Sequence, residues 1–320
     1  MEPDYLKTAP YWAQQIYKRT TALGRQNIEL LFKPRRWHIE GCGWSGYRLF
    51  LDNRASVQLR GAHNNLARLV WPADRPSGKK RKRGSSSVVF DDDRKYFGRS
   101  GGMERGKDVH KELEDFIMMP PDRFQHVHPK VDPLTSSVLR NLKQYGLKPI
   151  ASEVTVGDVQ LSEDGKDIVI KSHSGTALDI VCINTLGEIE TVETKTGYSG
   201  TNFAESDEKT LNMRAPFAHL KDTPLVRAKL QLLYGAVLLH VSKGIRPTGL
   251  WIAHGSPDTD EAILHQVDHS VLNGWNLMLS GLRTQHVHEL KMKELKKAAH
   301  KNAPKPKPKN AKGPLIIIKL

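Results

Sequence analysis

Three charged residues near the middle of the chain have the types and spacing that metal-assisted hydrolysis requires. Asp179 interrupts an apolar stretch, and Glu193 and Lys195 lie two positions apart in the segment TVETKTG. Residues two apart in an extended strand point to the same face. Carboxylate oxygens are the ligands that Mg²⁺ and Mn²⁺ prefer. A nearby lysine could position or deprotonate an attacking water, or stabilise charge that develops on a phosphate.

The same residues also have an ordinary explanation, as outward-facing charges on an amphipathic strand. Glu-x-Lys is short and arises by chance in many proteins. If the two strands pair through the turn at residues 184–187, Asp179 lies opposite the neighbourhood of Glu193, and two carboxylates and a lysine share one rim. The pairing of these two strands therefore decides between the two interpretations.

Short β-branched segments surround the three charged residues and predict an antiparallel meander of three to four strands. The expected strands are residues 149–156, 167–171, 177–183 and 188–194. Turn signals at Asp164-Gly165 and at residues 184–187 separate consecutive pairs.

Helical patterns flank the meander on both sides. Apolar residues with helical spacing predict a helix over residues 103–118. Asp132-Pro133 is typical of a helix start, and Gly146 of its end. We expect further helices over 224–240 and 260–299, with a strand at 247–254 between them. The order predicts an α/β fold with a central mixed sheet flanked by helices.

The chain divides into four segments by composition. We expect an ordered N-terminal extension over 1–71, a basic Gly/Ser/Pro-rich loop over 72–100, a core over 101–282, and a basic C-terminal helix with a Lys/Pro tail over 283–320. Within the extension, residues 47–51 and 56–60 alternate like short strands. The sequence FKPRRW mixes basic and aromatic residues suited to phosphate contact and base stacking. The extension is therefore either a DNA-grasping subdomain or a structural cap.

The positive charge lies on the flanks of the chain. The net charge is 49 − 35 = +14, of which residues 79–83 contribute +5, residues 291–320 contribute +9 and residues 1–78 contribute +6. The remainder is therefore 14 − 5 − 9 − 6 = −6. A mildly acidic body with basic flanks suits a protein that attracts a polyanion through its extensions.

Composition excludes several classes of protein. A hydrophobic content of 38% and a charged content of 26% allow a buried core. Two cysteines cannot form a disulfide framework. The longest apolar run, over residues 230–241, is too short and too polar to span a membrane, and the first ten residues are unlike a secretory signal. We expect a soluble, intracellular protein without membrane contact. The basic run at 79–83 is of the nuclear-import type, for a eukaryotic host.

The motifs around the charged residues resemble those of the PD-(D/E)XK nuclease superfamily, in its RecB-like branch with the lambda-type and viral alkaline exonucleases. The resemblance covers residues 103–255. It rests on an Asp at a strand centre followed by Glu-x-Lys-Thr-Gly, on Gly106-x-x-x-His110 in the upstream helix, and on Glu153 in the first strand. The downstream pair Gln231 and Tyr234 is spaced three apart, where the family more often has four.

The resemblance implies a restriction-endonuclease-like core that binds Mg²⁺ or Mn²⁺. Asp179 and Glu193 would ligate the metal, with the backbone carbonyl of Thr194 as a further ligand. His110 would be an additional ligand of the RecB-like kind. Glu153 would be a catalytic residue that helps to position the metal or the water.

It also implies the roles of three further residues. Lys195 would be the catalytic lysine, acting with the acidic residues. Gln231 and Tyr234 would bind the substrate backbone or brace the site, and both would lie on one helical face.

We therefore expect a metal-dependent nuclease that hydrolyses DNA phosphodiester bonds, as an exonuclease or end-processing enzyme in recombination, repair or replication. Two alternatives stay open: a structure-specific endonuclease, and a non-catalytic nucleic-acid-binding protein on the same fold. Asp179, Glu193 and Lys195 are all present, which argues against the second alternative. The sequence does not separate DNA from RNA as the partner.

The C-terminal tail has two expected functions. Residues 291–312 carry nine lysines, and prolines at 304, 306 and 308 prevent helix there, so this segment should contact phosphates. Residues 314–320 are mostly apolar and could add a strand to a sheet edge. That strand would join the protein's own sheet or a protein partner.

Overall fold

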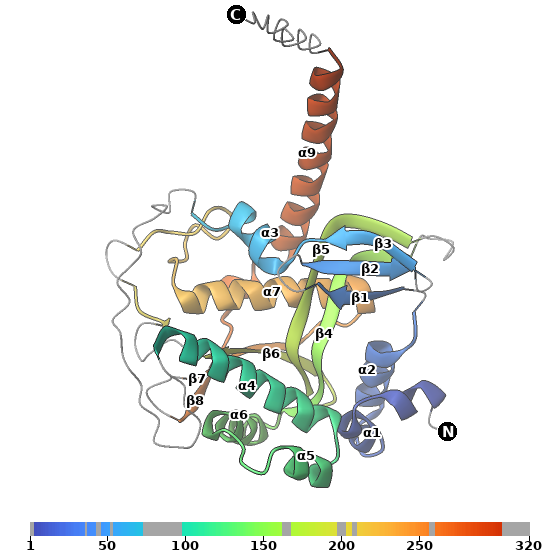
Figure 1. Cartoon of the computed structure of the whole chain (residues 1–320), viewed down its shortest axis with the longest axis vertical. Coiled ribbons are helices and arrows are strands. Elements are labelled where there is room, and N and C mark those ends of the chain that lie inside the picture. Colours follow the sequence, from blue (N-terminus) through green and yellow to red (C-terminus); the bar gives the residue numbers. More distant parts are fainter. Residues whose placement is uncertain are drawn as a thin grey trace, which may run out of the picture.

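The protein has a mixed α/β fold in which a curled five-stranded sheet is flanked by helices (Figure 1). The computed structural model describes residues 3–35, 37–42, 46–51, 54–72, 98–161, 168–196, 203–206, 210–255 and 260–302. The sheet order is β4-β5-β6-β7-β8, with β4 (Lys148–Leu161), β5 (Ile168–Ile183), β6 (Ile189–Thr196), β7 (Gly249–Gly255) and β8 (Ala262–Gln266). β6 and β7 are parallel and the other neighbours are antiparallel.

One expected division between strands and one expected helix start were wrong. β5 is one continuous strand, so the segments expected at 167–171 and 177–183 belong to a single long hairpin with β4. The helix expected over 260–299 begins later, because residues 262–266 form β8. In that strand Ala262 and Leu264 are buried while Ile263 is 60% exposed, which is the alternation of a sheet with one buried face.

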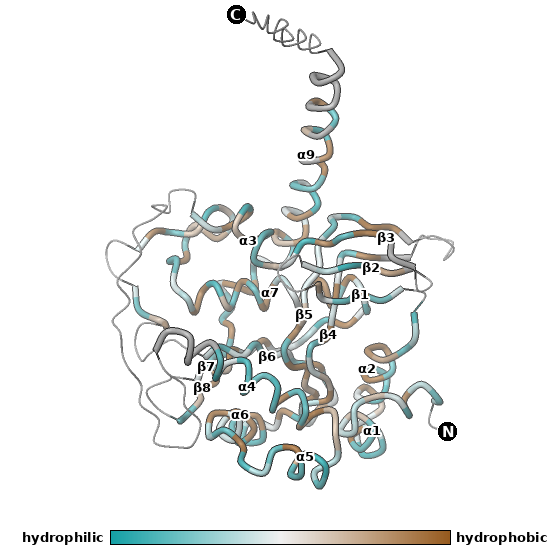
Figure 2. Tube along the Cα trace, viewed as in Figure 1, coloured by the Kyte–Doolittle hydropathy of each residue, from teal (hydrophilic) through white to brown (hydrophobic). Residues whose placement is uncertain are grey.

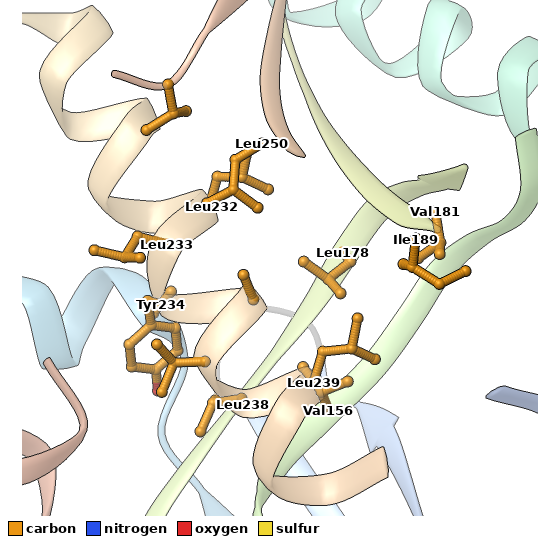
Figure 3. Close-up of a cluster of buried hydrophobic side chains, with 14 of the residues drawn as sticks. Val156, Leu178, Val181, Ile189, Leu232, Leu233, Tyr234, Leu238, Leu239 and Leu250 are labelled. Atoms are coloured by element: carbon orange, nitrogen blue, oxygen red, sulfur yellow. The ribbon is translucent and has the colours of Figure 1, made fainter. Parts of the chain in front are cut away.

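Helices cover both faces of the sheet and create two apolar cores. One face packs against α4 (Gly98–Met118) and α6 (Pro133–Gln144), which the short α5 (Pro121–Val127) joins. The other face packs against α7 (Pro224–Lys243). Figure 3 shows this second core, in which α7 contributes Leu232, Leu233, Tyr234, Leu238 and Leu239, and the sheet contributes Val156, Leu178, Val181, Ile189 and Leu250.

The predicted ends of α6 are confirmed, whereas α4 begins earlier than predicted. The Asp132 side chain accepts a hydrogen bond from the N–H of Leu134, and Pro133 occupies the first helical position. Gly146 adopts φ +72°, the left-handed conformation that commonly follows a helix. α4 starts at Gly98 rather than at residue 103, so a glycine-rich segment forms its first turns.

The N-terminal segment is built into the main core. It contributes a 3₁₀ turn (Asp4–Thr8) and the helices α1 (Tyr11–Tyr17), α2 (Ala22–Phe32) and α3 (Ala62–Leu69). Their buried side chains lie in the same core as α7: Leu6, Ala13, Ile28 and Leu66. The helical parts of residues 1–71 therefore pack into the same core as α7.

A second sheet of three antiparallel strands packs on the half of the β4–β5 hairpin that is distant from β6 (Figure 1). Its strands are β1 (Trp37–Gly41), β2 (Tyr47–Leu51) and β3 (Arg54–Leu59), and β1 was not predicted. It packs through a small apolar cluster: Trp37, Ile39, Leu49, Leu59 and Val159.

The last two helices are α8 (His269–Leu272) and α9 (Trp275–Asn302), and α9 leaves the body of the molecule (Figure 1). Arg283 fastens α9 through two hydrogen bonds, of 2.9 and 3.2 Å, to the fully buried Asp158. His286 stacks on His173 with ring centroids 4.6 Å apart. Beyond these contacts α9 alternates hydrophobic and hydrophilic residues (Figure 2). The expected boundary at 282/283 falls inside this helix.

Several expectations concern residues that the structure does not describe. The basic run at 79–83, the segment at 303–312 and the apolar segment at 314–320 all lie outside the described residues. Of the helices that are described, none has the length and apolar character needed to cross a membrane.

Candidate metal centre

The site forms where β5 and β6 separate. Their ladder runs from Ile183 paired with Ile189 to Ile180 paired with Val192, as expected for strands joined by the turn at 184–187. Asp179 comes next, and its Oδ2 accepts hydrogen bonds of 2.8 Å from both the backbone N–H and the Oγ1 hydroxyl of Thr194. At the fork between the strands, the Asp179 carboxylate thus accepts the N–H of Thr194, which a backbone carbonyl would accept if the ladder continued.

Three side chains from three elements converge at this fork. His110 of α4 lies with Nδ1 3.8 Å from Glu153 Oε1 and with Nε2 3.8 Å from Asp179 Oδ2. One ligand atom from each of the three residues lies within 4.8 Å of the others. Two carboxylates and an imidazole are suitable ligands for a divalent cation such as Mn²⁺ or Mg²⁺. We call the group of His110, Glu153 and Asp179 the metal cluster.

Gly106 explains how His110 reaches the cluster. A Cβ atom at position 106 would lie 2.4 Å from Thr196 Oγ1, so glycine lets α4 approach the end of β6 this closely without a shift of the Thr196 side chain. His110 follows four positions later on the same face of the helix. Its Nε2 lies 2.6 Å from Thr194 Oγ1 in a hydrogen bond. The Gly-x-x-x-His spacing therefore places the imidazole on β6.

Glu153 holds an unusual backbone conformation inside β4. Its φ is +49°, in the left-handed region that non-glycine residues seldom adopt. Its neighbours keep the ladder with β5, since Ser152 pairs with Ile180 and Val154 with Leu178. Glu153 therefore stands opposite Asp179 with a distorted backbone and a half-exposed side chain. Conformations of this kind cluster at functional sites.

Glu193 lies next to the metal cluster but has other partners. Its Oε1 accepts a hydrogen bond from Lys195 Nζ and another, of 2.7 Å, from Gln231 Nε2 of α7. Glu193 is 2% exposed, whereas the Lys195 side chain is 26% exposed. The predicted ligands were His110, Asp179, Glu193 and the Thr194 carbonyl, with Glu153 as a helper. The structure groups His110 and Asp179 with Glu153 rather than with Glu193. It brings Glu193, Lys195 and Gln231 together as a second group.

The electrostatics of the two groups are coupled. Burial, and secondly the charge of Asp179, raise the pKa of Glu193 to about 7, although Lys195 and His110 act in the opposite direction. Burial alone would lower the pKa of His110, but the carboxylates of Asp179, Glu153 and Glu193 together raise it to about 9. Three converging carboxylates require positive charge nearby, and in the protein alone His110 and Lys195 supply it.

Tyr234 does not match its predicted contact with substrate. Its side chain is fully buried in the core, and its hydroxyl accepts a 2.8 Å hydrogen bond from Asn65 Nδ2 of α3. Asn65 Nδ2 also donates to Ser174 Oγ of β5. Tyr234 therefore fits the alternative role of bracing the site, because it ties α7 to α3 beside β5.

Two residues near the cluster were missed by the sequence analysis. The Thr194 side chain binds both His110 and Asp179, although only its backbone carbonyl was considered. Tyr47 of β2 accepts a 3.0 Å hydrogen bond from the N–H of Ala177, two residues from Asp179. Thr194 could have been inferred from its place between Glu193 and Lys195. The sequence contains no signal for Tyr47, because the contact spans 130 residues.

Comparisons with known proteins leave the family of the chain open. No family model matches it, and no curated protein matches it. A solved structure described as "Crystal structure of SSO0001" is 13% identical, with 55% of this chain and 87% of that chain covered. Its TM-score is 0.22, and a likeness of that size carries no argument about fold or function.

Proposed function

We propose that the protein is a metal-dependent nuclease that hydrolyses phosphodiester bonds in DNA. The observation that carries the proposal is the metal cluster, with Lys195 next to it on β6. The order of the motifs supports a restriction-endonuclease-like core, because a helix with His110, a strand with Glu153 and the Asp179 and Glu193-x-Lys195 strands converge on one point. The basic flanks of the chain support a polyanionic substrate.

The residues of the cluster fit a divalent cation and are held in place by their neighbours. Bound Mg²⁺ or Mn²⁺ would polarise the scissile phosphate and lower the pKa of a coordinated water. Thr194 fixes the orientation of its two partners through its N–H and hydroxyl, so His110 and Asp179 keep their positions. Such supporting contacts usually determine how tightly a metal is held.

Lys195 would act on the substrate itself. Its ammonium group is held by Glu193, yet the side chain remains partly exposed near the C-terminal end of β6. Gln231 holds the Glu193 carboxylate in place, because it donates a hydrogen bond to the oxygen that also accepts from Lys195. Lys195 can therefore donate a hydrogen bond to a phosphate oxygen or to the attacking water.

The decisive experiment measures cleavage of DNA with Mg²⁺ or Mn²⁺ by single-residue variants. Lys195→Ala and Asp179→Ala should each lower turnover by about a hundredfold or more, because each removes a group that stabilises the transition state. Lys143→Ala is the matched control, since Lys143 is an exposed lysine of α6. Thermal unfolding of each variant shows that the fold is retained.

Two outcomes would contradict the nuclease proposal: cleavage that continues undiminished in excess EDTA, or wild-type turnover in Lys195→Ala. The nature of the nuclease is tested separately on linear and covalently closed circular DNA. An exonuclease or end-processing enzyme degrades only the linear form, whereas a structure-specific endonuclease also acts on closed molecules that contain its target structure.

A further inference from the structure

The small sheet β1–β2–β3 has one apolar face and one exposed face. Trp37, Ile39, Leu49 and Leu59 point inward and are buried against the β4–β5 hairpin. The alternate positions point outward, and their side chains are exposed or partly exposed. The outward residues with described side chains are His38, Glu40, Arg48, Phe50 and Gln58. We call this surface the outer face.

Two aromatic rings stack on each other on the outer face. His38 and Phe50 are direct partners across β1 and β2, and their rings are parallel to within 5° with centroids 5.0 Å apart. Glu40 holds the imidazole from the side, at 3.2 Å from His38 Nε2. The His38 side chain remains 46% exposed. Aromatic rings that are fixed and open to solvent are where unstacked nucleobases bind.

The charge of this segment suits a nucleic-acid strand. Residues 33–60 contain six Lys/Arg and two Asp/Glu, so their net charge is 6 − 2 = +4. Arg48 is exposed on the outer face, two residues from Phe50 along β2 and directly across from Glu40 of β1. An exposed guanidinium next to stacked rings can bind the phosphate that follows a stacked base.

Hydrogen bonds tie the sheet to the strands of the metal cluster. Tyr47, which precedes Arg48, accepts the N–H of Ala177, two residues from Asp179. Thr155, two residues from Glu153, donates a 2.6 Å hydrogen bond to the carbonyl of Ile39. The outer face and the two carboxylates therefore belong to one connected set of strands.

We propose that the outer face binds single-stranded nucleic acid and guides it toward the metal cluster. His38 and Phe50 stack with the bases and Arg48 binds the backbone. A duplex does not use this surface in the same way, because its bases are stacked inside the helix. The guiding role depends on the proposed nuclease function, whereas the binding itself does not.

The test measures binding of a fluorescent oligothymidylate to the full-length protein in EDTA, by fluorescence anisotropy. Phe50→Ala should weaken binding by about tenfold, the loss expected for one base–aromatic stack. Arg48→Ala should reduce the salt slope of binding by about 0.7, the value for one phosphate contact on a single strand. Binding of a blunt duplex should change less than twofold in Phe50→Ala.

Two controls separate recognition from loss of structure. Tyr145→Ala removes another exposed aromatic residue, 52% exposed, whose ring contacts Trp251 of β7 at a tilt of 54°, and it should bind the oligonucleotide like the wild type. Phe50→Leu keeps apolar volume but lacks the ring, so it decides the question if Phe50→Ala lowers thermal stability. It should lose affinity as well.

Wild-type affinity in both Phe50 variants would overturn the proposal, and so would equal losses on single strands and duplexes. The nuclease proposal fails in a different way, through the absence of cleavage by the wild type. Binding that depends on Phe50 in a protein without cleavage would leave the outer face as a binding surface alone.

Discussion

Gly106 is the residue on which the position of His110 depends. Gly106→Ala places a methyl group 2.4 Å from Thr196 Oγ1, so α4 must move away from β6 or Thr196 must rotate. We expect the affinity for Mn²⁺ to fall by about tenfold or more, the usual effect of disturbing the support of a metal ligand. Isothermal titration calorimetry measures it directly.

Gly281→Ala is the control for this experiment. The added methyl group would lie 3.6 Å from its nearest neighbour, Leu69 Cδ2, which is an ordinary contact. Alanine in a helix interior should stabilise α9 by about 0.5–1 kcal/mol and leave Mn²⁺ affinity unchanged. Equal Mn²⁺ affinity in Gly106→Ala and the wild type would show that the close approach of α4 is not required.

Because of Lys243, at the end of α7, the free energy of unfolding should change with pH in the alkaline range. Burial, and secondly the charge of Arg35, lower its pKa from 10.5 to about 8. Below pH 8 the lysine is charged in both the folded and the unfolded protein, so the folded state bears the full free-energy cost of burying the charge. As pH rises from about 8 to 10.5 the folded protein loses this proton first, so the free energy of unfolding should rise.

Lys243→Met tests this prediction by urea unfolding across that pH range. The variant should be more stable than the wild type at pH 7 by about 1–3 kcal/mol, and its stability should rise less toward pH 10. Lys18→Met, at an exposed lysine, should follow the wild type. Parallel curves for Lys243→Met and the wild type would contradict the assignment.

The individual site residues were easier to predict than their grouping. His110, Glu153 and Asp179 were all found, because each lies in a short local motif. Their association in one cluster, with Glu193 turned to Lys195 and Gln231, depends on the fork between β5 and β6 and on the left-handed backbone at Glu153. Neither feature has a sequence signature.

At the scale of elements, the contact between α9 and the β4–β5 hairpin depends on an ion pair in which the carboxylate is buried and the arginine is partly exposed. Asp158 is fully buried and Arg283 is its partner. Arg283→Met leaves the carboxylate without compensation and should destabilise the protein by about 3 kcal/mol. The double variant Asp158→Leu/Arg283→Met should recover most of that loss, because no buried charge remains.

Chemical denaturation measures both variants, with Arg123→Met on the exposed surface of α5 as the control. If the double variant is no more stable than Arg283→Met, the two residues do not stabilise the protein as a pair.

Elements with strong end signals were predicted well, and elements defined by long-range pairing were not. α6 has an N-cap, a proline and a terminal glycine, and its bounds agree with the prediction. β8 has only five residues, and although the turn-rich segment GSPDTD precedes it, its alternation was assigned to an expected helix. β1 was missed because its pairing with β2 defines it more clearly than its composition.

At the scale of the whole molecule, the basic C-terminal residues should add affinity without adding catalysis. Deleting residues 303–320 removes five lysines. Each phosphate contact that is lost lowers the salt slope of duplex binding by about 0.9. We therefore expect a flatter salt dependence and a higher KM, with kcat nearly unchanged.

Steady-state kinetics and binding at several salt concentrations measure these effects. A full-length variant with the five lysines replaced by glutamine should behave like the deletion. If only the deletion changes the oligomeric state, the apolar segment at 314–320 contacts a partner. An unchanged salt slope in both would show that these lysines do not bind phosphate.

The integration of residues 1–71 into the main core was also beyond the sequence. Its contacts join positions far apart in the chain, such as Asn65 with Tyr234 and Tyr47 with Ala177. A single sequence shows that such a segment can be ordered, but it does not show against which surface the segment packs. The structure supplies the packing of this segment and an exposed outer face, and a DNA-grasping role stays a prediction.

The left-handed backbone at Glu153 implies that stability of the fold and metal binding make opposite demands on this position. Replacement by glycine would relax the strained φ of +49° and should stabilise the fold by about 1 kcal/mol, while it removes a ligand. Glu153→Gln keeps the strain and loses only the charge, so the difference between the two variants in thermal denaturation isolates the backbone contribution. If Glu153→Gly is the more stable, mutational drift without selection for metal binding would favour glycine at this position, and a glutamate retained there would be a mark of function.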